Sequence, residues 1–322
     1  MNEFLMICER IVPEIVSVLK ERYKILNHLV YEEPIGRRTL ATATDLPERT
    51  VRSHIELMRA NGLVDIYKPG IFLTDEGHAI VPKLRNFLNG VIITPTEGTL
   101  MVKKLGFAAA KLLQELLEPD SVVAISGGST MAAVAEEMPV LPFNPIVVPA
   151  RGGVGEVVEY QANVIASVLA ERLRGSYKML HLPDGLSQDS LHMLMTCEPQ
   201  IKEIGDLISR TDVLLFGIGT AMRMADQRHI ADDVRKQLID NHAVGEALGQ
   251  YCDIEGKLIY STNNIGLSLP DVVKVPNVIA VAGGQEKANA IIGVMRACQK
   301  GILIIDEQAA EGMRQLLQIS AL

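Results

Sequence analysis

The sequence has no tryptophan, and its 6 phenylalanines and 7 tyrosines leave a core that must be built mainly from aliphatic side chains. It has no apolar run that approaches the roughly 20 residues needed to cross a bilayer as a helix. Its start lacks a basic segment followed by an apolar one, so we expect no signal peptide and no membrane partner. The 4 cysteines lie far apart, in no metal or redox spacing. We therefore expect a cytoplasmic protein with free thiols.

Two nucleotide-binding fingerprints are also missing. No loop reads glycine-x-glycine-x-x-glycine, because Gly217-Ile218-Gly219 is followed by Met222 where the third glycine would fall. No P-loop pattern occurs either. The 7 histidines show no ligand spacing. The sequence therefore predicts neither a metal site nor a cofactor.

Length and charge indicate two domains with different surfaces. A chain of 322 residues exceeds the usual size of one domain. Residues 1–90 hold 12 Lys/Arg and 12 Asp/Glu, so the net charge of −8 belongs to residues 91–322. An acidic second part argues against nucleic-acid binding over the whole surface. A local basic face on the neutral first part stays possible.

Residues 37–73 have the pattern of a winged helix-turn-helix. Two short helices are expected on either side of Asp45-Leu46-Pro47, and Asn61-Gly62 ends the second. Two short apolar strands follow around Lys68-Pro69-Gly70, and a further helix is expected from Thr74 to about Leu88. The order of helix, turn, helix and hairpin predicts a DNA-binding domain over residues 1–90.

The free face of the second helix is polar and basic. We expect four of its side chains to enter a major groove of double-stranded DNA: Arg49, Thr50, Arg52 and Ser53. Three further cations are expected on DNA phosphates: Arg37, Arg38 and Lys68. The alternative is a small helical interaction domain whose arginines are merely solvated. The order of the elements, together with the arginines on the free face of the second helix, favours DNA binding.

The stretch Ser121–Met138 is the centre of the second domain, residues 91–322. A buried strand, Val122–Ile125, runs into a glycine turn and then into an alanine-rich helix. Such a turn directs backbone N–H groups toward an anion. The turn consists of Ser126, Gly127, Gly128, Ser129 and Thr130. An ordinary strand-to-helix turn is the alternative for this loop taken alone.

Further apolar strands recur between helical segments in the second domain. They are expected at residues 146–148, 179–182, 213–216, 278–281 and 302–305. Fully apolar strands that alternate with helices predict a parallel α/β sheet covered on both faces. A helix over residues 100–117 connects the domains, and it either packs on the second domain or mediates self-association.

The loops that follow the strands carry similar chemistry. Gly127–Thr130, Arg151, Gly217–Thr220 and Gly283–Lys287 supply glycines, hydroxyls and cations. Ligands of parallel sheets bind beyond the carboxyl ends of the strands. The sequence therefore predicts a site for a phosphorylated small molecule at this edge.

Several motifs of the second domain, taken with the winged domain, point to a known family. They read SGGST, ARGG, EYQAN, GIGTAM, AVGEALG and AGGQEKANAI. Over essentially its whole length the chain resembles the SorC family of bacterial sugar-responsive transcription regulators, and within it the branch that controls glycolytic operons. The resemblance implies a second domain similar to glucosamine-6-phosphate deaminase and ribose-5-phosphate isomerase, whose site a regulator can reuse without the chemistry.

The resemblance also implies roles for particular residues. It places the 127–130 loop and Arg151 on a phosphate, and Arg228 on a second phosphate. Lys287 would neutralise phosphate, Gln161 would hydrogen-bond the sugar or a phosphate, and Glu246 would accept from sugar hydroxyls. The effector in this branch is fructose-1,6-bisphosphate, whereas other members bind monophosphates or unphosphorylated sugars.

We therefore expect a repressor of glycolytic genes that binds operator DNA as a dimer or tetramer and responds to a phosphorylated sugar. The rival class is a sugar-phosphate isomerase or deaminase with a fused DNA-binding domain. An enzyme would need a base and an acid beside the sugar, and Glu246 is the one carboxylate that we can place there. We expect no catalytic residue. A protein-interaction module is a third class, and it predicts no salt-dependent DNA binding.

Overall fold

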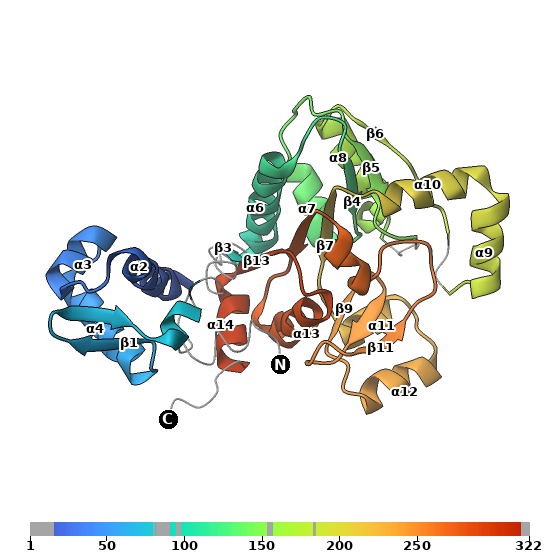
Figure 1. Ribbon diagram of the computed structural model, residues 1–322. Coiled ribbons are helices and arrows are strands. Elements are labelled where there is room, and N and C mark those ends of the chain that lie inside the picture. Colours follow the sequence, from blue (N-terminus) through green and yellow to red (C-terminus); the bar gives the residue numbers. More distant parts are fainter. Residues whose placement is uncertain are drawn as a thin grey trace. The chain divides into compact units, whose positions relative to one another are not determined.

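The computed structural model describes residues 16–79, 81, 91–94, 98–152, 157–182 and 185–316 (Figure 1). These residues form two compact units. One holds the residues up to Val91 together with those from Arg314 on, and the other holds Ile92–Met313. No helix in these described ranges is both long and apolar enough to cross a membrane.

The first unit is a winged helix-turn-helix, as the sequence predicts. Its helices are α2 (Val16–Glu32), α3 (Arg37–Thr44) and α4 (Glu48–Ala60), followed by strands β1 (Val64–Tyr67) and β2 (Gly70–Leu73). The strands pair antiparallel around Lys68-Pro69, which forms the tip of the wing. Beyond Val81, the expected helix over residues 74–88 lies outside the described residues.

Aliphatic side chains from all these elements form the core of the first unit. Ile25 of α2, Leu40 of α3, Ile55 of α4 and Ile71 of β2 are each at most 1% exposed. Between α3 and α4 the chain turns at Asp45, which has a left-handed φ of 54°. Aspartate tolerates this conformation better than most residues because its short side chain can bond locally. The tight turn fixes the angle at which α4 leaves the core.

The second unit is built on a seven-stranded sheet in the order β3-β13-β12-β7-β4-β5-β6. Its strands are β3 (Val91–Thr94), β4 (Val122–Ile125), β5 (Ile146–Pro149), β6 (Ser176–Tyr177), β7 (Val213–Gly217), β12 (Asn277–Val281) and β13 (Ile302–Asp306). The neighbours from β13 to β6 pair parallel. The predicted parallel α/β class is therefore confirmed.

Helices cover this sheet and close its core. They include α6 (Met101–Leu116), α7 (Ser129–Glu137), α8 (Ala162–Arg172), α10 (Pro199–Ser209) and α13 (Ala288–Cys298). Helix α9 (Gln188–Cys197) buries no side chain and packs against α10, and α14 (Glu307–Leu316) follows β13. Helix α6 matches the helix expected over residues 100–117, and its inner face packs within this unit. A Cβ at Gly106 would lie 2.7 Å from the Ala133 carbonyl carbon, so α6 and α7 touch backbone to backbone.

Two features of the second unit differ from the sequence prediction. The strand expected over residues 179–182 is wrong, since the edge strand β6 ends at Tyr177. The Asn163 side chain replaces a strand partner there: it accepts from the Leu180 N–H at 2.9 Å and donates to the Leu180 carbonyl at 3.1 Å. Residues 91–94, expected only to interrupt a helix, form β3 at the edge of the sheet.

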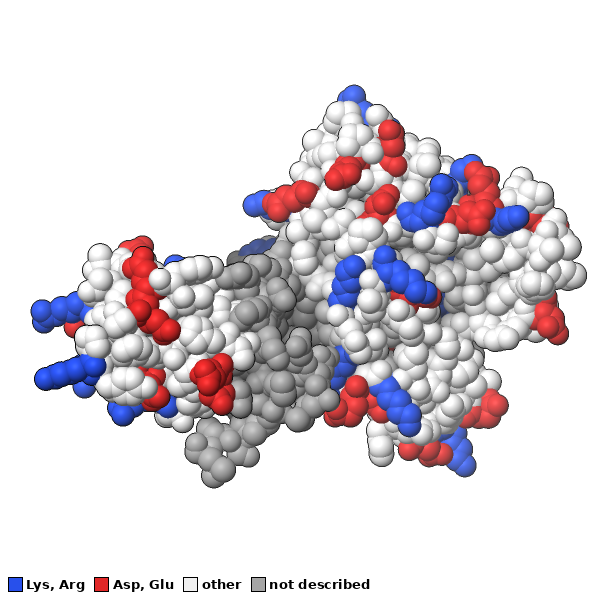
Figure 2. All heavy atoms as spheres, in the orientation of Figure 1, with Lys and Arg blue, Asp and Glu red and all other residues white. Residues whose placement is uncertain are grey.

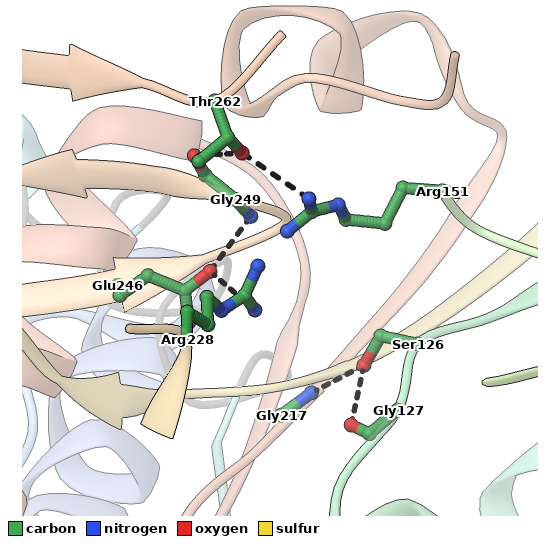
Figure 3. A network of polar contacts seen from close by, with 8 residues as sticks. All are labelled: Ser126, Gly127, Arg151, Gly217, Arg228, Glu246, Gly249 and Thr262. Carbon is green, nitrogen blue, oxygen red and sulfur yellow. Dashed lines mark hydrogen bonds and ion pairs between the residues drawn. The ribbon is translucent and has the colours of Figure 1, made fainter. Parts of the chain in front are cut away.

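A second, antiparallel sheet was not predicted. It contains β8 (Gly219–Thr220), β9 (Gly245–Ala247), β10 (Gln250–Cys252) and β11 (Leu258–Ser261), in the order β11-β10-β9-β8. Helices α11 (Ala221–Gln227) and α12 (Asp232–Asp240) lie between β8 and β9 in the chain. This small sheet carries Glu246 to the loops at the end of the large sheet (Figure 3).

Candidate functional site

Several of the predicted phosphate-binding residues follow strands that are direct neighbours in the large sheet. Strand β4 pairs parallel with β5 on one side and β7 on the other, and β7 pairs parallel with β12. Their carboxyl ends therefore lie along one edge. The segments after β4, β5 and β12 carry the predicted Gly127–Thr130 loop, Arg151 and Lys287, whereas Gln161, Arg228 and Glu246 come from other elements.

The 127–130 loop contacts a second segment very closely. The Gly128 N–H donates to the Tyr160 carbonyl at 2.8 Å, and a Cβ at Gly127 would lie 2.7 Å from that oxygen. Gly128 also has a φ of 112°, which L side chains rarely adopt. The loop thus needs both glycines, one for the close approach and one for the conformation.

Helix α7 begins directly after this loop. Among the described residues, no side chain caps its N-terminus. Ser129 is exposed and Thr130 is half-buried. The first N–H groups of a helix have no partner within the helix, and the helix dipole favours negative charge at that end. With two hydroxyls beside it, this end of α7 can take a phosphate.

Gln161 adjoins the same loop. It directly precedes α8 and is half-buried, and its carbonyl carbon lies 3.9 Å from the Cβ position at Gly127. On the other side of the loop, Ser126 joins β4 to β7 because its Oγ accepts from the Gly217 N–H at 3.1 Å (Figure 3). The structure therefore brings the EYQAN and GIGTAM segments against the SGGST loop.

Arg151 follows β5 and is only 6% exposed. Its Nη2 donates to the Thr262 hydroxyl at 3.1 Å (Figure 3). The flanking backbone pairs with the segment after β11, through Gly152 N–H to the Ile265 carbonyl and Leu267 N–H to the Ala150 carbonyl, both at 2.8 Å. Both the backbone and the guanidinium of Arg151 are thus fixed.

Glu246 of β9 is 3% exposed and forms an ion pair with Arg228, which follows α11. The Glu246 Oε1 lies 3.0 Å from Arg228 Nη2 and accepts from the Gly249 N–H at 2.7 Å (Figure 3). The resemblance implies separate roles for these two residues, one on sugar hydroxyls and one on phosphate. The structure shows them together, so a phosphate at Arg228 would share its guanidinium with Glu246.

Lys287 lies in the loop after β12 and is half-buried. Burial, and then the positive charge of Arg223, lower the pKa of the Lys287 ammonium group. Arg223 lies in α11 and is exposed. Two mutually repelling cations near the carboxyl ends of the strands favour an anionic ligand. From the segment Arg223–Arg228, the sequence analysis selects Arg228 for phosphate and leaves out Arg223, which directly follows the GIGTAM motif.

The predicted DNA-contacting side chains lie on the surface of the first unit. Six of them are exposed and Thr50 is half-buried; the exposed ones are Arg37, Arg38, Arg49, Arg52, Ser53 and Lys68. Lysine and arginine side chains gather at the end of this unit formed by α3 and α4 (Figure 2). Arg38 pairs with Glu48 at 3.6 Å and Arg52 with Glu56 at 2.9 Å. Such exposed pairs contribute little, so DNA phosphates can replace the carboxylates.

Sequence reasoning also missed a polar contact beneath this surface. His54 of α4 is 6% exposed, and its Nδ1 accepts from Arg22 Nε at 3.2 Å. Its Nε2 lies 2.9 Å from a carboxylate oxygen of Glu21. The imidazole therefore joins α4 to α2 and fixes the rotation of the helix that carries the predicted DNA contacts.

Comparisons with known proteins agree with this two-part organisation. The family model named Sugar-bind matches residues 85–314, and the model of the CggR N-terminal DNA binding domain matches residues 18–88. The chain is 33% identical to the central glycolytic genes regulator of Bacillus subtilis, over 97% of this chain and 98% of that one. The regulator of the same name from Priestia megaterium is 35% identical, with the same coverage.

Solved structures give the same result. A SorC family transcriptional regulator from Enterococcus faecalis is 37% identical, with a TM-score of 0.64 over 69% of this chain and 93% of that one. The full-length sorbitol operon regulator of Klebsiella pneumoniae has a TM-score of 0.65 over 94% of this chain and 100% of that one. At 21% identity, that second likeness supports the fold alone.

The fold and the site thus define a DNA-binding protein with a sugar-binding domain. The chain belongs to the SorC family, and it is a sugar-responsive transcriptional repressor. The relatives named above are regulators, not enzymes. The individual site residues stay predictions.

Proposed function

We propose that this protein represses glycolytic genes and that fructose-1,6-bisphosphate is its effector. The observation that supports the bisphosphate is the order of the strands. Lys287 and Arg223 follow β12 and β7, the 127–130 loop follows β4, and Arg151 follows β5. Cations therefore stand on both sides of the phosphate-binding loop, as a ligand with two phosphates requires.

The proposed regulation couples effector binding to operator binding. The winged domain binds a palindromic or repeated operator as a homo-oligomer in the cytoplasm, because symmetric DNA sites match symmetric proteins. The bisphosphate lowers operator affinity only as far as it prefers the low-affinity state of the protein. The assignment to glycolytic genes is carried over from the two relatives, which share about one-third of their residues with this chain.

Thermal unfolding with different ligands tests the effector. We would compare fructose-1,6-bisphosphate, fructose-6-phosphate and inorganic phosphate. A ligand that binds only the folded protein adds about 2.7 kcal/mol at 100 times its dissociation constant, which raises the melting temperature by several degrees. A large shift with the bisphosphate alone is expected. No shift with any of them would overturn the proposed effector.

Operator binding tests the repressor. Fluorescence anisotropy with a duplex from a glycolytic operator should show affinity that falls steeply with salt, because bound cations displace counterions from DNA. The bisphosphate should weaken that binding, whereas inorganic phosphate at the same concentration should leave it unchanged. Operator affinity that is indifferent to the bisphosphate would contradict the regulatory part of the proposal.

A further inference from the structure

The two arginines of the effector site are joined by a continuous chain of contacts. Arg151 donates to the Thr262 hydroxyl at 3.1 Å, and that hydroxyl donates to the Gly249 carbonyl at 3.0 Å. The Gly249 N–H donates to Glu246 at 2.7 Å, and Glu246 pairs with Arg228 at 3.0 Å. Figure 3 shows both guanidinium groups reaching the turn that carries Gly249.

That turn joins β9 to β10 and is short. Ala247 pairs with Gln250, so Leu248 and Gly249 alone form the turn, with φ of 52° and 77°. Positive φ at both central positions is the geometry of a type I′ hairpin, which matches the twist of paired strands. Leu248 is 5% exposed, so its buried side chain holds the turn against the domain. The turn is therefore a rigid base for both arginines.

Arg151 lies in a cradle made by the segment after β11. The Asn264 side-chain oxygen, oriented by its hydrogen-bond partners, accepts from Arg151 Nε at 2.7 Å and from Nη2 at 2.5 Å. A Cβ at Gly249 would overlap the guanidinium, and one at Gly266 would overlap the Arg151 Cβ. Two contacts from one amide oxygen and one from a hydroxyl fix the plane of the guanidinium.

We propose that Thr262 and Asn264, through the Gly249 turn, fix the position of Arg151 relative to Arg228, so that the site prefers a sugar bisphosphate to a monophosphate. This inference rests on the proposed function, in which both arginines meet phosphate. Ordering an arginine costs side-chain entropy on binding, and a guanidinium ordered beforehand avoids that cost. A ligand with one phosphate needs only one of the anion-binding groups, so it gains less from their fixed spacing. Thr262 and Asn264 are thus positioning residues that do not themselves touch the phosphates.

The test uses Thr262→Val, which keeps the side-chain shape but removes the hydroxyl. Isothermal titration with fructose-1,6-bisphosphate should show about tenfold weaker binding, the effect of one hydrogen bond to a charged group. At least one of fructose-1-phosphate and fructose-6-phosphate should bind within about twofold of the parent protein, because it can use the other anion-binding groups. Ser261→Ala is the matched control, since the neighbouring Ser261 hydroxyl contacts Gln250 rather than Arg151.

A double-mutant cycle separates positioning from a general structural role. In an Arg151→Ala background, Thr262→Val should change bisphosphate affinity by less than about twofold, because its effect passes through Arg151. A tenfold loss in both backgrounds would overturn the inference. Tighter bisphosphate binding by Thr262→Val would also overturn it, since Thr262 would then be a latch that holds Arg151 away from the ligand.

The parent protein separates failure of this inference from failure of the proposed function. If it binds no sugar phosphate, the proposed effector fails. If it binds the bisphosphate and Thr262→Val behaves like Ser261→Ala, only the positioning inference fails. Melting temperatures of the unliganded variants, within a few degrees of the parent, establish that each is folded.

Discussion

The two units of this protein hold the cations that are predicted to contact phosphate in opposite ways. In the winged domain the arginines are exposed, and the Arg38 side chain is 90% accessible with an ion pair of 3.6 Å. In the sugar-binding domain Arg151 is 6% exposed and hydrogen-bonded through its Nε and Nη2 atoms. A DNA duplex offers many phosphates, so loosely ordered cations suffice, and each adds to the salt dependence. A small ligand offers one or two phosphates, so the protein must fix each group beforehand.

Removing one partner of a fixed pair should have the largest effect. Glu246→Ala leaves the Gly249 N–H without its acceptor and Arg228 without its carboxylate, which should lower the free energy of unfolding by about 2–3 kcal/mol. Sugar-phosphate binding should weaken, while the folded variant should keep its operator affinity. Urea unfolding, calorimetry and operator anisotropy measure the three quantities.

Glu246→Gln is the control for this comparison, because its amide oxygen can still accept from Gly249 while the charge is lost. It should recover part of the unfolding free energy. Equal loss of effector and operator binding in folded Glu246→Ala would contradict the assignment of Glu246 to the effector site.

Removing an exposed arginine should affect DNA alone. Arg49→Ala should weaken operator binding about tenfold or more if Arg49 contacts a base, and should relax specificity at that position. Arg38→Ala should instead weaken binding to all duplexes and lower the slope of log affinity against log salt by about one. Neither variant should change bisphosphate affinity. Anisotropy over a salt series, with operator and unrelated duplexes, distinguishes the two patterns, and a sequence-independent effect of Arg49→Ala would place it on phosphate.

The fixed site should also be sensitive to a single methyl group. Gly127→Ala would place a Cβ 2.7 Å from the Tyr160 carbonyl oxygen, so the loop must move away from the segment that precedes α8. We expect several-fold weaker bisphosphate binding, measured by calorimetry. In Gly217→Ala, the matched change on the neighbouring strand, the nearest atom is 4.0 Å away and the N–H still reaches Ser126. Parental bisphosphate affinity in Gly127→Ala would show that the 127–130 loop adapts.

The sequence predicts best where local patterns decide the structure. Local signals of a few residues mark the apolar strands that end in glycines and the turn between α3 and α4. The sequence analysis predicted both features. The small antiparallel sheet has strands of two to four residues, and long-range pairing decides them. The pairing of Arg228 with Glu246, and the cradle from Thr262 to Gly266, depend on that sheet. The motifs could therefore name Arg151, Arg228 and Glu246, but not the contacts that these residues make.

Buried polar residues explain two further differences between prediction and structure. His54 has the polarity of the exposed face of α4, yet it lies in the core because Arg22, 32 residues earlier, contacts it there. Residues 179–182 have the pattern of a strand, but the Asn163 amide takes both hydrogen bonds of Leu180. In each case a single side chain from a distant segment satisfies the polar groups, and no local periodicity records it.

The smallest expected effect is a pH dependence at the edge of the fixed site. Burial and Arg223 lower the pKa of Lys287. Because the folded state binds this proton less tightly than the unfolded chain, charged Lys287 costs stability at neutral pH, and the cost disappears as pH rises. A phosphate prefers the charged form, so bisphosphate affinity should fall as pH rises toward the lowered pKa, below the usual 10.5 of lysine. Sugar phosphates keep their charge in this range, since their second pKa is about 6.

Titration calorimetry between about pH 7.5 and 10 measures this decrease, which should amount to a few-fold. Lys287→Gln should bind more weakly at neutral pH and should lose the pH dependence. Arg223→Gln removes one repelling charge, so it should shift the decrease to higher pH, unless Arg223 itself holds the phosphate and affinity falls at every pH. The winged domain provides the comparison: Lys287 lies outside it, so operator binding should decrease less than bisphosphate binding over the same range. A parallel decrease in operator affinity would show that the alkaline effect is not local to the sugar site.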